Sequence, residues 1–261
     1  EEALMDKAKE FDSVIKMGRT QLQDAVPIRL GQEFHAYASA IRRDIRRFDN
    51  AKEEIRCLNL GGTAIGTGLN ADVQYFHRVV KNMSTLTGEE LVQSYDMIDA
   101  TQNLDSYASV SGIVKNCAVN LSKMSNDLRL MSSGPRTGFG EINLPARQNG
   151  SSIMPGKINP TVAELIMHLC DKVFSNAAGL NIGVHSGWLG SDSHSSLPLK
   201  CMLDSCTLLS DGCEVFKRKV ISGLTANKER SAEHARMSLA LQMPLAQIVG
   251  EDKAREVARY A

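Results

Sequence analysis

Residues 104–131 read LDSYASVSGIVKNCAVNLSKMSNDLRLM, and apolar side chains recur in this stretch every three or four positions. This spacing places them on one face of an α-helix and is typical of a long bundle helix with a coiled-coil-like seam. A helix of this length cannot be covered on every side by so short a chain, so we expect it to pack against other long helices. The seam is formed by Leu104, Tyr107, Val110, Val114, Cys117, Leu121, Met124, Leu128 and Met131.

Three other stretches have the same helical periodicity. Long helices are predicted at residues 32–58, 160–182 and 196–221, beside one at 101–131. Alternating runs rich in Val, Ile and Thr, which indicate strands, are nearly absent. The sequence therefore predicts an all-α fold, a mostly antiparallel long-helix bundle that oligomerises with copies of itself.

The two ends of the chain differ from this bundle. A first amphipathic helix is expected to end at Gly18, and residues 18–32 are expected to form a polar segment that crosses to the next helix. The apolar face of that first helix comprises Leu4, Ala8, Phe11 and Ile15.

The periodicity breaks after Gly223, where a new helix begins. We expect a bundle domain at residues 1–223 and the start of a small C-terminal helical domain at residues 224–261. Both ends fall inside helical patterns, which is typical of a piece of a longer chain.

The charges are balanced, with 30 Lys and Arg against 30 Asp and Glu. Such a chain has no net positive field to hold nucleic acid and no obvious membrane-binding face. The sequence also lacks an apolar run of membrane-spanning length and a signal-peptide pattern. A small-molecule partner is favoured.

The cysteines are widely spread, without a C-x-x-C pair, and several lie in apolar helical patterns. This distribution favours reduced, buried thiols in a cytoplasmic protein over a disulfide framework or a zinc site. They are Cys57, Cys117, Cys170, Cys201, Cys206 and Cys213.

Residues 148–160 read QNGSSIMPGKINP and combine two glycines, a mid-loop proline and one lysine. Asn159 followed by Pro160 is typical of a helix start, and a helix N-terminus favours an anion. With Lys157 beside it, this loop indicates a site for a small carboxylate or phosphate. The same composition also marks ordinary loops, so the pattern alone leaves both interpretations open.

GSSIMPGKINP, residues 150–160, resembles the signature loop GSSxMPxKxNP of the fumarase/aspartase superfamily. Residues 18–27, 61–70 and 126–136 resemble further runs of the same family, in the family's order. The similarity is close over most of residues 12–175 and fades afterwards. It implies the all-α central domain of this superfamily, with the signature loop at residues 134–160.

The resemblance implies a lyase that removes a proton next to a carboxylate and then expels a group from the neighbouring carbon. In the family the first serine of the loop is the base, which corresponds to Ser151, while Lys157, Asn159 and Ser152 correspond to substrate-binding positions. No metal and no organic cofactor is implied. The expected partner is a small dicarboxylate, aspartate or fumarate. The family also implies a homotetramer whose active sites combine residues of several subunits.

Thr20 and Gln21 match the positions that meet the other end of the substrate. Fumarases usually have histidine at the second of these, and some aspartases have glutamine, so the resemblance favours loss of ammonia from aspartate. A fumarate hydratase remains the first alternative. Arg19 and Arg136 are either substrate ligands or internally paired arginines, and the sequence does not decide between these roles.

One family run is altered. The family has G-x-L-E-L-N where this chain reads Gly187-Trp188-Leu189-Gly190-Ser191-Asp192, so Gly190 replaces the glutamate and Asp192 the asparagine. His185 and His194 lie close by and are candidates to compensate. The family's early Ser- and Thr-rich substrate segment would lie before residue 1. A non-catalytic helical assembly fragment is therefore the second alternative.

Overall fold

The computed structural model describes residues 1–187, 189, 190, 195–238 and 242–260, with the side chain of Met243 excepted. The chain forms two compact units. Unit 1 comprises residues 1–41, 123–167 and 213–261, and unit 2 comprises residues 42–122 and 168–212.

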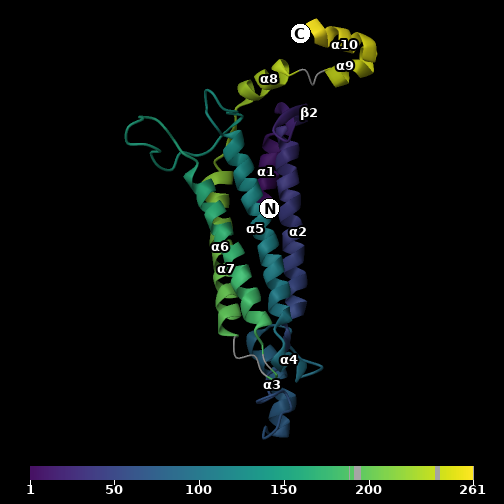
Figure 1. Ribbon diagram of the computed structural model, residues 1–261, viewed down its shortest axis with the longest axis vertical. Coiled ribbons are helices and arrows are strands. Elements are labelled where there is room, and N and C mark those ends of the chain that lie inside the picture. The colour runs from purple at the N-terminus through teal and green to yellow at the C-terminus, as the bar shows by residue number, and fades with distance from the viewer. Residues whose placement is uncertain (188, 191–194, 239–241, 261) are drawn as a thin grey trace. The chain divides into compact units, whose positions relative to one another are not determined.

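Helices dominate both units, as the sequence predicts (Figure 1). The helices of the described residues are α1 Glu2–Glu10, α2 Leu30–Ile55, α3 Val73–Thr87, α4 Asp99–Gln102, α5 Asp105–Met131, α6 Thr161–His185, α7 Ser196–Phe216, the π-helical turn η1 Lys217–Ile221, α8 Lys228–Met237, α9 Gln242–Val249 and α10 Glu251–Tyr260. The short strands are β1 Ile15–Thr20, β2 Gln23–Arg29, β3 Cys57–Leu58, β4 Val92–Gln93, β5 Ile142–Asn143 and β6 Thr225–Ala226.

The core of unit 1 forms where α1 and the hairpin β1–β2 meet the start of α2. Phe11 and Phe34 are almost fully buried and contact each other edge to face, with ring centroids 5.2 Å apart. Gly31 allows the backbones to approach closely, since a Cβ there would lie 2.3 Å from the carbonyl oxygen of Ala8. In the same unit α5 packs against α6, and the Ser125 hydroxyl donates to the Ala163 carbonyl at 2.6 Å.

In unit 2, α6 and α7 pack antiparallel to each other. As the residue numbers rise along α6, the partners on α7 fall: Asn176 Nδ2 donates to Ser205 Oγ at 3.1 Å, and a Cβ at Gly183 would lie 2.6 Å from Pro198. Small residues at the contact allow this close approach of helices. The antiparallel arrangement that the periodicity predicted is confirmed for this pair.

Residues 18–32 are not a simple crossing segment, and this prediction was wrong. Strands β1 and β2 form an antiparallel hairpin across residues 15–29, with a bulge at Gly18. A Cβ at Gly18 would lie 2.6 Å from the Val26 carbonyl oxygen, so glycine is required there. Charged side chains and the irregular register hide the strand alternation in the sequence.

Several helix ends also differ from the prediction. Helix α1 ends at Glu10, and Ile15 belongs to β1 with 47% of its surface exposed. Residues 101–131 divide into α4 and α5, because Asn103 has an extended backbone. The predicted helix at 196–221 becomes π-helical after Phe216.

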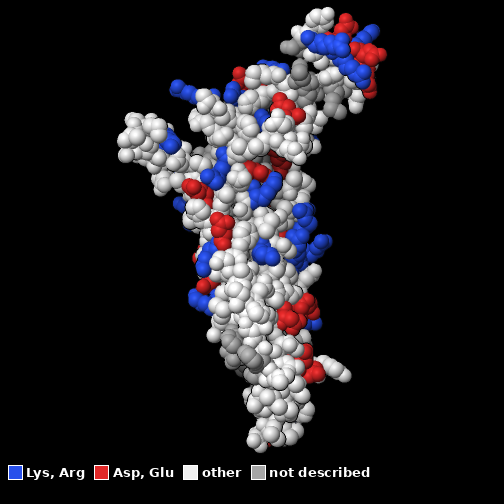
Figure 2. Space-filling view, viewed as in Figure 1, with Lys and Arg blue, Asp and Glu red and all other residues white. Residues whose placement is uncertain are grey.

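The cysteines are only partly buried. Cys117, Cys170 and Cys201 are buried, as expected, whereas Cys57, Cys206 and Cys213 are exposed. Basic and acidic side chains are interspersed over much of the face in Figure 2, in keeping with the balanced charge. Among the described residues, no helix combines the length and apolar character needed to cross a membrane.

Candidate active site

The loop at residues 148–160 is closed at its base by its own backbone. The Gly150 N–H donates to the Lys157 carbonyl at 2.8 Å, and Asn159 Nδ2 donates to the Gly150 carbonyl at 3.3 Å. A Cβ at Gly150 would lie 2.8 Å from Asn159 Oδ1 and 2.9 Å from the Lys157 oxygen. Glycine is therefore needed for the loop to close.

Ser151 lies directly after this closed base. Its Oγ accepts hydrogen bonds from the backbone N–H groups of Ile153 and Met154, both at 3.2 Å. Ser151 is half-buried, while Ser152 and the residues up to Ile158 are exposed. Two N–H donors at one hydroxyl oxygen favour its deprotonated form, which is what a serine base requires.

Asn159 and Lys157 have different environments. Helix α6 begins at Thr161, one residue later than predicted, and the Asn159 side-chain amide closes the base of the loop. The Lys157 side chain is exposed, and within the described loop no hydrogen bond joins it to Ser151. At Ser151 the loop N–H groups of Ile153 and Met154 supply the hydrogen-bond donors.

Thr20 and Gln21 lie at the tip of the β1–β2 hairpin, and both are exposed. Thr20 pairs with Gln23, which leaves Gln21 and Leu22 as a two-residue turn with φ of 51° and 65°. Left-handed backbone at two residues with a Cβ is unusual and marks a held conformation.

A cavity of about 360 Å³ lies beside this tip, within unit 1. The Tyr37 hydroxyl donates to Asp127 at 2.9 Å, and burial with the nearby Asp127 carboxylate raises the pKa of Tyr37 well above its ordinary value. Burial also raises the pKa of Glu33, against the opposing effect of Lys16. The lining comprises Lys16, Arg19, Gln21, Leu22, Glu33, Ala36, Tyr37, Lys123, Asp127, Leu130, Met131 and Phe139.

Ser151 and the rest of its loop do not line this cavity within one chain, although all of these residues are described. Of the two predicted halves of the site, residues 20–21 and residues 150–159, only Gln21 lines this cavity.

Arg19 is internally paired. Its Nη1 lies 2.8 Å from Glu141 Oε1, and its guanidinium lies 4.3 Å from the centroid of the Phe139 ring. Arg136 is exposed. The internal role that the sequence left open for Arg19 is therefore the one observed.

Sequence reasoning missed the buried charged groups behind the hairpin. Glu141 is fully buried, and Lys16, Arg19 and His234 lie around its carboxylate. Arg19 and His234 are separated by 215 residues in the sequence, so no local motif could reveal this cluster.

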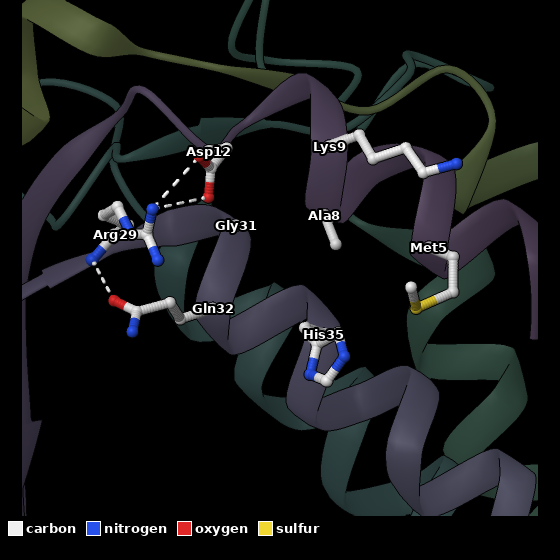
Figure 3. Close-up of a pocket in the computed structure, with 8 residues that line it drawn as sticks. All are labelled: Met5, Ala8, Lys9, Asp12, Arg29, Gly31, Gln32 and His35. Atoms are coloured by element: carbon white, nitrogen blue, oxygen red, sulfur yellow. Dashed lines mark hydrogen bonds and ion pairs between the residues drawn. The ribbon is translucent and has the colours of Figure 1, made fainter.

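A larger cavity, of about 750 Å³, lies between α1 and the start of α2 (Figure 3). Arg29 lines it and pairs with Asp12 at 3.0 Å, while its backbone N–H donates to Gln32. Figure 3 shows Lys9 and His35 on opposite sides of this space. None of the predicted site residues lines it.

The altered family run is partly described. Gly190 has φ of +80°, a conformation that a glutamate would adopt only with strain, and His185 is the exposed last residue of α6. Trp188, Asp192 and His194 lie outside the described residues. Among the residues that the structure describes, no group of three or more His, Cys, Asp or Glu side chains is arranged to hold a metal.

Comparisons with known proteins were made for sequence and structure. The model of a family described as lyase matches residues 1–175. The aspartate ammonia-lyase of Bacillus subtilis (strain 168) is 45% identical over 98% of this chain, which corresponds to 54% of that protein. The aspartate ammonia-lyase of Pseudomonas fluorescens is 44% identical over 100% of this chain and 55% of its own length. The chain thus spans about half the length of the curated relatives it matches.

Solved structures agree with this similarity. A fumarate lyase:delta crystallin from Brucella melitensis, bound to cobalt, superimposes with a TM-score of 0.96 at 42% identity, covering 100% of this chain and 56% of that one. A recombinant class II fumarase from Schistosoma mansoni gives a TM-score of 0.92 at 32% identity, covering 99% and 57%.

Proposed function

Since the chain belongs to this lyase family, within the fumarase/aspartase superfamily, we propose that it eliminates ammonia from L-aspartate to give fumarate. The observation that supports this most directly is the 45% identity to a curated aspartate ammonia-lyase along nearly the whole chain. The family and the all-α fold expected from the signature loop are confirmed. The activity is a proposal, because the chain corresponds to about half of each relative.

Ser151 is the proposed base. It removes a proton from the carbon next to a carboxylate, and the N–H groups of Ile153 and Met154 stabilise its alkoxide. The electron pair moves into the carboxylate to form an enediolate-like dianion. The C–N bond then breaks, and ammonia leaves as the double bond of fumarate forms.

Lys157, Asn159 and Ser152 are the proposed ligands of that carboxylate. Lys157 is exposed and supplies a full positive charge, and Asn159 Nδ2 keeps one hydrogen beyond the one it donates to Gly150. Ser152 is exposed beside the base and supplies a hydroxyl. These donors stabilise the dianion more than the substrate, which is how they accelerate the reaction.

Thr20 and Gln21 are the proposed ligands of the other end of the substrate. A glutamine amide donates and accepts hydrogen bonds but does not exchange protons near neutral pH, unlike histidine. This suits a leaving amine, which departs without a relay of water protons.

The site is proposed to form between subunits of a homotetramer, in the cytoplasm. In support, the Ser151 loop does not line the cavity beside the hairpin tip within one chain, although both segments are described. We retain the predicted boundary between a bundle domain, residues 1–223, and the start of a C-terminal domain at residues 224–261, as part of the same proposal.

A fumarate hydratase is the second candidate, and the likeness to a class II fumarase at a TM-score of 0.92 favours it. A non-catalytic assembly fragment is the third. It is supported by the left-handed backbone of Gly190, at which the family's glutamate would be strained.

The test measures fumarate by its ultraviolet absorbance after the full chain is mixed with L-aspartate or, separately, with L-malate. Fumarate from aspartate that disappears in Ser151→Ala supports the ammonia-lyase. Fumarate from malate alone would show that the chain is a fumarate hydratase and not an ammonia-lyase. If neither substrate reacts with this chain or with the complete product of its gene, the non-catalytic alternative replaces both.

A further inference from the structure

The tip of the β1–β2 hairpin has a backbone conformation that its own residues disfavour. Gln21 and Leu22 form the turn with φ of 51° and 65°, where Asn and Gly are the usual residues. Both carry a Cβ that crowds the neighbouring carbonyl oxygen in this conformation. Such a turn persists only if the surrounding structure holds it.

Arg19 is the contact that holds the tip. Only 13% of its side chain is exposed, and it binds Glu141 at 2.8 Å and lies over the Phe139 ring. Thr20, the next residue, is exposed. Because successive side chains of a strand point to opposite faces, fixing Arg19 inward directs Thr20 outward.

Glu141 connects this arginine to three elements. Its N–H donates to the Met131 carbonyl at the end of α5 at 2.9 Å, and its carbonyl accepts from the Asn227 N–H at 2.8 Å. Its carboxylate lies 3.2 Å from the Lys16 ammonium of β1. Burial alone would raise the pKa of Glu141, but Lys16, His234 and Arg19 together hold it below its ordinary value.

His234 brings α8 into this cluster. Its Nδ1 lies 3.0 Å from Glu141 Oε1 and 3.4 Å from Arg19 Nη2, so it is within reach of both members of the ion pair. Asn227 caps the start of α8, accepting from the Arg230 N–H at 3.1 Å, while its own N–H bonds to Glu141. Helix α8 is therefore bound to Glu141 both at its N-cap, Asn227, and at its seventh residue, His234.

We propose that Glu141 and His234 are positioning residues, which hold Arg19 and through it the strained turn that presents Thr20 and Gln21 to the substrate. Helix α8 lies beyond residue 175, outside the part of the chain matched by the family model. The assignment rests on the proposed function for the identity of the substrate, but the geometry of the turn does not depend on that function.

The test compares the steady-state kinetics of L-aspartate elimination in three variants of the full chain. His234→Ala removes the contact, and His234→Asn restores a donor near the Nδ1 position. Glu233→Gln is the matched control, because it removes a partly exposed ion pair with Arg230 from the same helix. Backbone amide hydrogen exchange of residues 15–29 is measured on the same proteins.

We expect His234→Ala to raise KM by about tenfold or more with little change in kcat. The variant loses a hydrogen bond to a charged group, and the hairpin tip that this bond holds contributes to substrate binding. His234→Asn should return KM toward that of the parent, and Glu233→Gln should match the parent. Exchange in the hairpin should be faster in His234→Ala alone.

The proposal fails if His234→Ala leaves KM unchanged, lowers kcat alone, or is not rescued by His234→Asn. If the parent forms no fumarate, the proposed function fails, and hydrogen exchange then decides the positioning role by itself. Faster exchange at residues 15–29 in His234→Ala, reversed in His234→Asn, would support it, and unchanged exchange would overturn it.

Discussion

Ser151 receives its two hydrogen-bond donors from its own loop, whereas Ser152 next to it is exposed. Two residues of the same type, one position apart, therefore have different local environments. This difference distinguishes the proposed base from a proposed ligand, and replacing each serine by alanine tests it.

We expect Ser151→Ala to lower kcat for aspartate by about 10²–10⁴-fold, the usual contribution of a positioned base. Ser152→Ala should act mainly on KM, because it loses a binding contact and leaves the base in place. The measurement is steady-state formation of fumarate. Equal losses of kcat in both variants would contradict the assignment of the base to Ser151.

Leu22 allows a second prediction at the scale of one residue. Its φ of 65° costs a residue with a Cβ about 1–2 kcal/mol, whereas the extra freedom of glycine in the unfolded chain costs about 0.5–1 kcal/mol. Leu22→Gly should therefore unfold at a higher temperature than the parent. Leu22→Ala keeps the Cβ and should not gain. A lower melting temperature for the glycine variant than for the alanine variant would refute the strain in this turn.

At the scale of elements, the loop at residues 148–160 depends on Gly150 for its closed base. Gly150→Ala would place a methyl group 2.8 Å from Asn159 Oδ1, so the base of the loop must open. We expect activity to be lost while the melting temperature stays close to that of the parent, because the loop is largely exposed. Gly112→Ala, where a Cβ meets nothing within 4 Å, is the matched control. Full activity of Gly150→Ala would show that the closed loop is not required.

Glu141 stabilises the contacts among α5, β1 and α8. Glu141→Gln removes the buried carboxylate that Lys16 and Arg19 share, and breaking a buried pair in this way costs about 3–5 kcal/mol. Lys16 then keeps Glu33 at 3.1 Å, and Arg19 keeps Asp24 at 3.8 Å. We expect this loss in the free energy of unfolding near pH 7. Glu251→Gln, which removes an exposed pair on α10, should change little.

The loss of stability in Glu141→Gln has a predicted pH dependence. The pKa of Glu141 is lowered in the folded protein from its ordinary value of 4.5, so its contribution is fully present above that value and is lost as the pH falls through the folded-state pKa. The gap between the parent and Glu141→Gln should therefore narrow in acid. Denaturant unfolding at several pH values measures it, and a gap that widens in acid would reverse the sign of the argument.

At the scale of the whole molecule, the Ser151 loop does not line the cavity beside the hairpin tip of the same chain. If each site combines the hairpin of one subunit with the Ser151 loop of another, mixed assemblies of Gln21→Ala and Ser151→Ala will contain some intact sites. Random mixing should restore about one quarter of the parent activity, since each site then draws each half independently. Two differently tagged Ser151→Ala chains are the control and should stay inactive. A mixture as inactive as its components would place both halves in one subunit or exclude assembly.

The long helices and the closed loop could be predicted because their signals are local. The apolar seam of residues 104–131 repeats with the period of a helix, and α5 follows it from Asp105 to Met131. The loop at residues 150–160 resembles a family signature, and the family model confirms the resemblance. Helix ends shifted by a few residues, because end positions depend on caps and tertiary contacts that periodicity does not contain.

Only the tertiary structure revealed the β1–β2 hairpin and the buried contacts of Glu141 and His234 that hold it. Charged residues at positions 15–29 hide the strand pattern, and the turn at Gln21 and Leu22 has backbone angles that its sequence does not favour. Glu141 and His234 are 93 residues apart, yet their side chains meet at 3.0 Å. A buried charge is stable only with its partners, and which distant groups become partners is set by folding of the whole chain. The sequence by itself determined the helices and the chemistry of the loop, whereas the folded chain decided how Thr20 and Gln21 are held.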